Sequence, residues 1–363
     1  MSAHRCLLVL SAGALLTCLP GLAQQPPAPA VKPPAAPGQQ DNLPRFVGSV
    51  TEVNVPVTVT DDRGKYVSNL EARDFRILDE GKPQRLQFFS HNQKQPIVVG
   101  FLVDMSNNTK IHWKTFQDAL EELVFTLLPG DARYSGYLIS YSNDAELLVN
   151  TTTDYNKLAD KIRKMKPGGG SALYDAIYMS CVRRELVKGE PYEPRRIIIV
   201  IGDGHDNASK HSRHEVLELA QRNLVTIFAV STQAFGFANE DRDVLEQLTT
   251  KTGGHVEYPM LNPYKDISGY LSQPSDAGNY AITVGTGGYA AQIAKGITEA
   301  TASLSGEIST QYVLRYIPEI DPESKPKVYR KIEVSIPGLP NVKIRAREGY
   351  YPQGIPPGPE GGQ

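Results

Sequence analysis

The N-terminal third of the chain contains a region in which apolar residues occupy every second position. Valine recurs at alternate positions from 53 to 59, and turn residues follow. Two further short strand-like segments, at 75–78 and 85–89, flank a second turn. A period of two is typical of strands that bury one face. We therefore predict a small antiparallel β unit within residues 45–92.

The pattern changes beyond Pro96. The run IVVGFLVD at 97–104 is apolar throughout, as expected of a strand buried on both faces. Amphipathic helical patterns then alternate with further strand-like runs, which lie at 134–141, 196–202, 224–230 and around 256. Strand alternating with helix over about 160 residues predicts an α/β fold, a doubly wound and mostly parallel sheet with helices on both faces.

Period two returns after a last helical pattern near 293–308. Three strand-like runs end the fold, at 312–317, 328–336 and 341–347. The simplest architecture pairs them with the strands of residues 45–92 as one antiparallel accessory domain. The α/β domain is then inserted between the two β segments, with expected boundaries of 96–310 for the α/β domain, 259–290 for an insertion or long loop, and 311–351 for the C-terminal β segment.

The first residues have the order of a secretory signal. Two cationic or polar residues, His4 and Arg5, precede an apolar run at 6–16, and small residues follow around Ala23. We expect cleavage after Ala23, and hence a secreted, periplasmic or cell-envelope protein. A lipoprotein signal at Cys18 is the less favoured alternative, because Leu16 and Thr17 fit it poorly.

The segments at the two ends of the predicted folded body are rich in proline. Residues 24–44 are expected to form an extended linker after the 1–23 signal peptide, and 352–363 a similar disordered tail. Removal of the leader leaves Cys181 as the one cysteine, so no internal disulfide is expected. Its spacing from Leu173 and Ile177 predicts a buried core residue.

The overall charge limits the classes of partner. A formal net charge of −2 provides no field to recruit nucleic acid, so no nucleic-acid partner is expected. Beyond the leader, no stretch approaches the roughly 18 consecutive apolar residues of a transmembrane helix. The mature chain is therefore expected to have no transmembrane segment.

Oxygen-bearing side chains gather where the predicted parallel strands end. Asp104 and Ser106 follow the first strand, Asp203 follows the strand at 196–202, and Ser171 begins a helix after three glycines. Because ligands of open α/β sheets bind at the carboxyl ends of the strands, these side chains are expected to share one edge. A hard cation such as Mg²⁺ prefers such a set of oxygen ligands, with some positions left for water or a partner.

These motifs resemble the metal-ion-dependent adhesion site of von Willebrand factor type A domains. The loop at 104–108 is similar to that family's DxSxS pattern, the glycine-rich loop carries a hydroxyl, and the Asp-Gly at 203–204 follows a later strand. The flanking hairpin at 74–84 and the C-terminal strands resemble the secreted VWFA-related proteins of acidobacteria. The resemblance covers roughly residues 46–351.

The resemblance implies a divalent cation, Mg²⁺ or a similar ion, held by five residues: Asp104, Ser106, Asn108, Ser171 and Asp203. Its free position would take an acidic side chain of a partner protein, with His205 and Asp206 on the partner-binding surface. Two positions depart from the family pattern. Ser171 replaces threonine and keeps the hydroxyl, whereas Asn108 replaces the last serine and changes the reach of the side chain.

Three functions are open at this point. The favoured one is a metal-dependent protein-binding module, and the alternative is a metal-independent scaffold in an envelope assembly. In the second case Asp104 and Asp203 would merely cap turns and helix starts. An enzyme is not expected, because no nucleophile, base and orienting group can be assembled, although a metal could act as a Lewis acid. His211 and His214 lack zinc-ligand spacing and are expected to be solvated.

Overall fold

The structure of the 363-residue chain is a computed structural model. It describes seven segments of the chain: residues 52–91, 96–110, 113–183, 194–233, 240–259, 287–319 and 329–352. The predicted signal peptide, the linker, most of the 259–290 insertion and nearly all of the C-terminal tail lie outside the described residues.

The centre of the fold is a six-stranded sheet of order β10-β9-β8-β5-β6-β7. Its strands are β5 (Ile97–Asp104), β6 (Tyr134–Tyr141), β7 (Ala145–Thr152), β8 (Arg195–Gly202), β9 (Thr226–Ser231) and β10 (Val256–Glu257). All neighbouring pairs are parallel except β6 and β7, which are antiparallel. The predicted α/β fold class is confirmed, and the antiparallel edge strand β7 is an addition to it.

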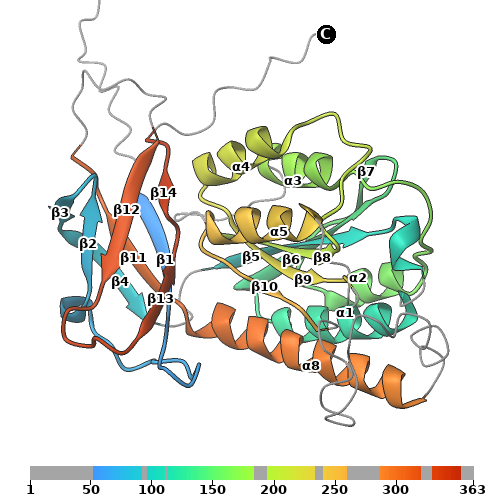
Figure 1. Ribbon diagram of the computed structural model, residues 1–363, viewed down its shortest axis with the longest axis horizontal. Coiled ribbons are helices and arrows are strands. Elements are labelled where there is room, and N and C mark those ends of the chain that lie inside the picture. Colours follow the sequence, from blue (N-terminus) through green and yellow to red (C-terminus); the bar gives the residue numbers. More distant parts are fainter. Residues whose placement is uncertain are drawn as a thin grey trace, which may run out of the picture. The chain divides into compact units, whose positions relative to one another are not determined.

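Helices cover both faces of this sheet (Figure 1). They are α1 (Trp113–Leu127), α2 (Tyr155–Ile162), α3 (Leu173–Val182), α4 (Arg213–Arg222), α5 (Glu240–Thr250) and α8 (Gly287–Thr310). Helices α1, α2 and α8 pack on one face, where they share a core with Val99, Phe101 and Val103 of β5. Helices α3, α4 and α5 pack on the other face, against Val98 and Leu102. The continuous apolar run of β5 is thus explained by burial on both sides.

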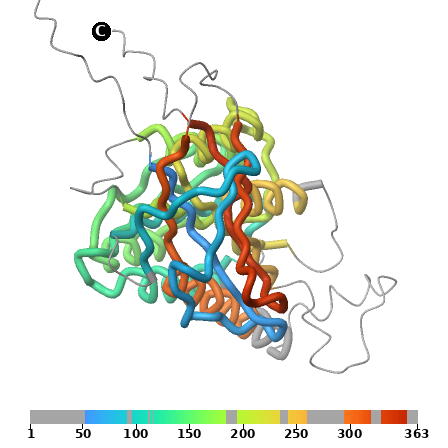
Figure 2. The backbone as a smooth tube through the Cα atoms, turned by 90° about the vertical axis from the view of Figure 1, so that its left-hand side faces the viewer, coloured from blue at the N-terminus to red at the C-terminus, as the bar shows by residue number. Residues whose placement is uncertain are grey.

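Two antiparallel sheets of four strands complete the described fold. Their orders are β13-β1-β11-β4 and β14-β12-β2-β3. The strands are β1 (Val53–Thr60), β2 (Arg76–Asp79), β3 (Lys82–Gln84), β4 (Leu86–His91), β11 (Tyr312–Tyr316), β12 (Arg330–Ser335), β13 (Lys343–Ala346) and β14 (Gly349–Tyr350). Each sheet combines strands from both flanking segments, as the pairs β1–β11 and β2–β12 show, and Figure 2 shows them side by side.

The alternating valines of β1 fill the core between these two sheets. Val53, Val55 and Val57 are fully buried, and they share a cluster with Ile77 of β2 and Ile332 of β12. The period of two therefore places one face of β1 against the second sheet, as predicted. The accessory β unit is formed by the flanking segments on either side of the α/β fold.

Polar residues join the antiparallel sheets and the end of α8 to the amino ends of the central strands. Arg195, the first residue of β8, donates to the carbonyl of Ile308. Arg347, just after β13, donates to the carbonyl of Leu224, which precedes β9. Glu307 near the end of α8 is fully buried and contacts both His255, just before β10, and β1. The opposite edge of the central sheet holds the candidate site.

Two further expectations concern the chain as a whole. Cys181 is buried and free, as predicted, and burial raises the pKa of its thiol to about 11. Among the helices that the structure describes, none combines the length and apolarity needed to cross a bilayer.

Candidate functional site

Three turns meet at the carboxyl edge of the central sheet. The first follows β5, the second is the glycine-rich loop before α3, and the third follows β8. Backbone bonds tie the first two together, because Gly168 N–H donates to Met105 O at 2.6 Å and Asn107 N–H donates to Gly169 O at 3.1 Å. The sequence positions predicted to share one edge are therefore brought together by the main chain itself.

The glycine-rich loop depends on its glycines for two different reasons. Gly169 has a φ of +106°, a conformation that side chains disfavour. At Gly170, a side chain would press on the Asn207 amide oxygen, since a Cβ there would lie only 2.8 Å from it. Asn143, just after β6, accepts the Gly170 N–H at 2.7 Å. The loop is thus held closely against both neighbouring turns.

Ser171 is buried and fixed on three sides by the turn after β8. Its N–H donates to Asn207 Oδ1 at 2.9 Å, and its carbonyl accepts the N–H of Asn207 and of Ala208. Its hydroxyl donates to the carbonyl of His205 at 2.7 Å. Because the hydroxyl proton is committed to that carbonyl, the oxygen lone pairs remain for another acceptor role, such as binding a cation.

Asp104 ends β5 and is 1% exposed. Its Oδ1 accepts the Ser106 N–H at 2.7 Å, whereas the buried Oδ2 has no hydrogen-bond partner among the described residues. Burial, followed by the charge of Asp203, raises the pKa of Asp104 to about 7, against the opposing effect of the Ser106 bonds. A buried carboxylate oxygen without a partner is costly unless it binds a proton or a cation.

The first and third turns are linked by side chains. Asn108 Nδ2 donates to Asp203 Oδ2 at 3.0 Å, and Asp203 Oδ1 accepts the His205 N–H at 2.9 Å. Ser106 caps the short 3-10 helix η2 (Asn107–Thr109) by accepting the Asn108 N–H at 3.3 Å. The five predicted ligand positions thus lie in three turns, and hydrogen bonds link each turn to the other two.

A known protein family matches the part of the chain that forms the central sheet and the three turns. Residues 99–262 match the von Willebrand factor type A (vWA) domain. The match begins within β5 and includes all three turns of the site. The mostly parallel sheet with helices on both faces is typical of a vWA domain.

One relative, an uncharacterized protein of Borreliella burgdorferi, is 30% identical over 138 residues. The aligned part is 32% of this chain and 39% of the relative, so the match spans about two fifths of that protein. The sequence similarity therefore extends over a single part of each protein.

Several solved structures are similar to parts of the chain. The vWF domain of the pilus tip protein Mfa5 from Porphyromonas gingivalis is 23% identical, with a TM-score of 0.28, covering 31% of this chain and 39% of that one. BatB from Bacteroides thetaiotaomicron is 15% identical, with a TM-score of 0.37, covering 55% and 98%. A von Willebrand factor type A protein from Catenulispora acidiphila is 11% identical, with a TM-score of 0.42, covering 77% and 62%.

The carboxyl edge of the central sheet presents both carboxylate and neutral oxygens. In the described residues, no three His, Cys, Asp or Glu side chains are grouped so that they could hold a metal ion. The carboxylates that the described part of the three turns offers to a cation are Asp104 and Asp203, beside neutral oxygens. The unpartnered Asp104 Oδ2 and the oriented Ser171 hydroxyl fit a hard cation, which binds such oxygen sets.

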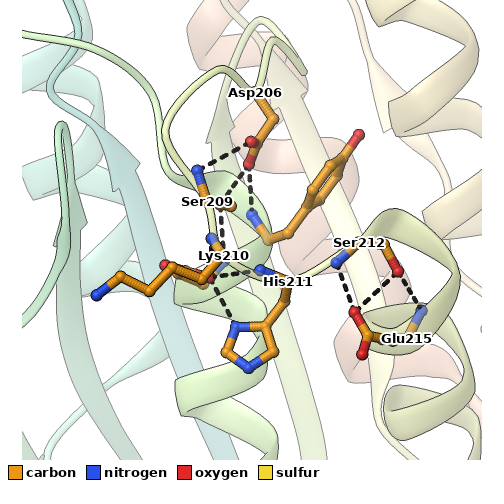
Figure 3. A network of polar contacts seen from close by, with 8 residues as sticks. Asp206, Ser209, Lys210, His211, Ser212 and Glu215 are labelled. Atoms are coloured by element: carbon orange, nitrogen blue, oxygen red, sulfur yellow. Dashed lines mark hydrogen bonds and ion pairs between the residues drawn. The ribbon is translucent and has the colours of Figure 1, made fainter.

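The two residues expected on the partner surface differ in their environment. His205 lies in the turn after β8, half-buried beside Asp203. The Asp206 carboxylate is engaged in internal hydrogen bonds, because its Oδ2 accepts the Tyr174 N–H at 2.8 Å and the Ser209 hydroxyl at 2.6 Å (Figure 3). Asp206 thus caps α3 from a distant segment, since the methyl side chain of the N-cap residue Ala172 cannot accept a hydrogen bond.

The same network contains His211, which lacks the spacing of a zinc ligand. His211 Nδ1 lies 2.7 Å from Asp175 Oδ1, and the His211 ring stacks on Tyr178 with the centroids 3.6 Å apart. Asp175 also accepts the N–H of Lys210 and of His211, which fixes the start of α4 to α3 (Figure 3). His211 is therefore a packing and hydrogen-bonding residue, half-buried rather than solvated as expected.

Three residues of the edge were not singled out from the sequence. Asn143 and Asn207 position the glycine-rich loop, and both follow strand ends, where the rule for α/β sheets would have found them. Tyr141, the last residue of β6, is buried and its hydroxyl has no hydrogen-bond partner among the described residues. Because aromatic residues are common in strands, its sequence context gave no signal of a polar role.

Proposed function

We propose that this chain is a protein-binding module whose vWA domain holds a divalent cation at the carboxyl edge of its sheet. Mg²⁺ is the ion that best suits the proposed ligands, which are mostly neutral oxygens with two carboxylates. When bound, the cation would supply a positive centre with at least one coordination position open to an acidic side chain of a partner protein. No catalytic role is proposed.

The observation that carries this proposal is the state of Asp104. Its Oδ2 is buried, without a hydrogen-bond partner in the described residues, and close to a second carboxylate. Asp203 lies across the edge, and Ser171 presents a hydroxyl whose proton is already committed. A cation among these three side chains would offset both the burial of Asp104 and the repulsion between the two carboxylates.

The first test is titration calorimetry of Mg²⁺ and Mn²⁺ into the mature chain. We expect one site, lost in Asp104→Ala and Asp203→Ala. Asp118→Ala is the matched control, because Asp118 is an exposed carboxylate of α1 that pairs with Lys114. Absence of binding to every form of the chain, or equal binding by the Asp104→Ala variant, would reject the metal site.

The second test concerns the partner. A synthetic peptide library with one central aspartate is compared with the same library carrying asparagine. We expect retention of aspartate peptides in Mg²⁺, and release by EDTA, because a charged carboxylate is a much stronger ligand of a hard cation than the neutral amide oxygen of asparagine. Retention that is the same for both libraries, or insensitive to EDTA, would contradict a metal-mediated contact.

A metal-independent scaffold remains the second candidate function, and one observation favours it. Asn108 donates to Asp203, and Ser106 caps η2, so protein hydrogen bonds already link the site residues. On this hypothesis the edge is held by hydrogen bonds alone. Thermal unfolding separates the two, since a cation that binds the folded state raises the melting temperature and a scaffold of this kind shows no change with Mg²⁺.

We also propose that the protein acts outside the cytoplasm, secreted or in the cell envelope. The basis is the charge and apolar order of residues 1–23, which lie outside the described residues. N-terminal sequencing of the mature protein tests this. A first residue at Gln24, or within a few positions, is the expected result, and an intact Met1 would contradict it.

A further inference from the structure

The Asn108 side chain lies across the proposed site and bonds to one of its two carboxylates. Asn108 Nδ2 is 3.0 Å from Asp203 Oδ2, and the two residues are 95 positions apart in the sequence. A carboxylate can only accept hydrogen bonds, so the amide must turn its NH₂ end, and not its oxygen, toward Asp203. The positive end of the amide thus faces an oxygen that a cation would also use.

We infer that Asn108 is a competitor of the cation, an internal hydrogen-bond donor that occupies Asp203 until the ion displaces it. This inference rests on the cation site proposed above and concerns its regulation. A cation that shares Asp203 Oδ2 would lie close to the partly positive NH₂ group, which is unfavourable. Binding therefore requires the amide to leave Asp203.

The local structure allows this movement. Asn108 is exposed, and its backbone N–H stays bonded to Ser106 in η2, so the side chain can turn without unfolding the loop. Asp203 is held independently, because its Oδ1 accepts the His205 N–H and its carbonyl accepts from Gln233 Nε2 at 2.7 Å. The amide is thus the movable part of a site whose carboxylate is fixed.

The competition predicts that removal of the amide tightens cation binding. We expect Asn108→Ala and Asn108→Ser to bind Mg²⁺ about tenfold more tightly than the wild type, the change expected from releasing one hydrogen bond to a charged group. The serine variant gains a hydroxyl that can present a lone pair, so it should bind at least as tightly as the alanine variant. Asn107→Ala, the neighbouring exposed amide in η2, is the matched control and should be unchanged.

A second readout follows the amide itself. In the wild type without Mg²⁺, the side-chain NH₂ protons of Asn108 should be protected from exchange with solvent by the bond to Asp203. Addition of Mg²⁺ should remove that protection, as seen by NMR of side-chain amides. A permanent ligand that keeps its bond to Asp203 while its oxygen holds the ion would instead retain the protection.

The outcomes separate this inference from the proposed site. Weaker Mg²⁺ binding by Asn108→Ala than by the wild type would make Asn108 a ligand, overturning the competition and leaving the site in place. Equal binding by both would also overturn it. If only the variants bind Mg²⁺, the competition is supported in its strongest form. If neither the wild type nor either variant binds, the cation site and the inference fall together.

Discussion

The charged cluster around His255 makes a prediction about pH that can be worked out from its contacts. His255 Nε2 lies 2.8 Å from Glu257 Oε1, and Nδ1 lies 3.0 Å from Glu307 Oε2, an ion-pair distance without the alignment of a hydrogen bond. Glu307 is fully buried and also bonds to Thr58 of β1 and Arg345 of β13. The cluster therefore joins β10 and α8 to the antiparallel strands β1 and β13.

The charge of His255 decides how strongly this cluster holds. Burial by itself lowers the pKa of His255, and Arg345 acts in the same direction. The interactions with Glu257 and Glu307 outweigh both and raise the pKa from 6.5 to about 8. A folded-state pKa above the unfolded value means that the stabilisation is complete below about pH 6.5 and is lost as the pH rises through about 8. Since one pKa unit is worth about 1.4 kcal/mol, the contribution amounts to about 2 kcal/mol.

The assay is urea unfolding of the wild type and of His255→Asn at about pH 6 and about pH 9, which lie on either side of this window. The free energy of unfolding of the wild type minus that of the variant should be about 2 kcal/mol larger at the lower pH than at the higher pH. His214→Asn is the control, because His214 is an exposed residue of α4 beside Glu218. A difference between wild type and His255→Asn that does not change with pH, or that grows as pH rises, would refute the reasoning.

Three further predictions concern packing and capping. Gly202→Ala would place a Cβ on the Tyr141 hydroxyl and 3.0 Å from the Asp104 Cβ, so it should lower the free energy of unfolding by about 1–3 kcal/mol. In a Tyr141→Phe background the loss should be smaller, and urea unfolding of the four combinations measures the coupling; strict additivity would disprove the contact. Ser212→Ala removes the capping hydroxyl of α4 and should cost about 1 kcal/mol by the same assay, whereas no loss would mean the cap is replaced. Gly254→Ala would drive a Cβ into the Ile227 carbonyl, and we expect a fall in melting temperature larger than for either of the other single changes.

Much of the fold could be predicted because its strands differ in their apolar pattern. Strand β5 is an apolar run up to Asp104, whereas β1 carries valine at every second position, so their periods are distinct in the sequence. Both strands are buried over most of their length. Strand β7 was not predicted, because every residue of it is partly or fully exposed and its apolar residues Leu147, Leu148 and Val149 are consecutive. An edge strand of this kind shows neither a continuous apolar run nor a period of two. The place of β7 in the sheet comes from pairing with β6, which the local sequence does not encode.

The candidate site was predicted as a set of positions, and its geometry was not. The rule that ligands lie at the carboxyl ends of parallel strands places Asp104 and Asp203 together without any coordinates. Which atom of Asn108 faces Asp203 depends on the path of η2, which no spacing rule gives. Likewise, Asp206 was expected on the partner surface, and its capping of α3 depends on where the turn after β8 folds back.

The described contacts place the accessory unit and the candidate site at opposite ends of the parallel strands. Arg347 of the accessory unit bonds to Leu224, while Ile308 and Glu307 near the end of α8 contact Arg195 and His255. Arg195, Leu224 and His255 lie at the amino ends of β8, β9 and β10. The candidate site lies at the carboxyl ends of β5 and β8, on the opposite edge of the same sheet. Because a parallel sheet gathers all its amino ends on one edge, attachment there leaves the carboxyl edge clear of the described strands of the accessory unit. A partner bound at Asp203 would therefore contact the vWA turns first, and substitutions at Glu307 should change stability without changing cation affinity.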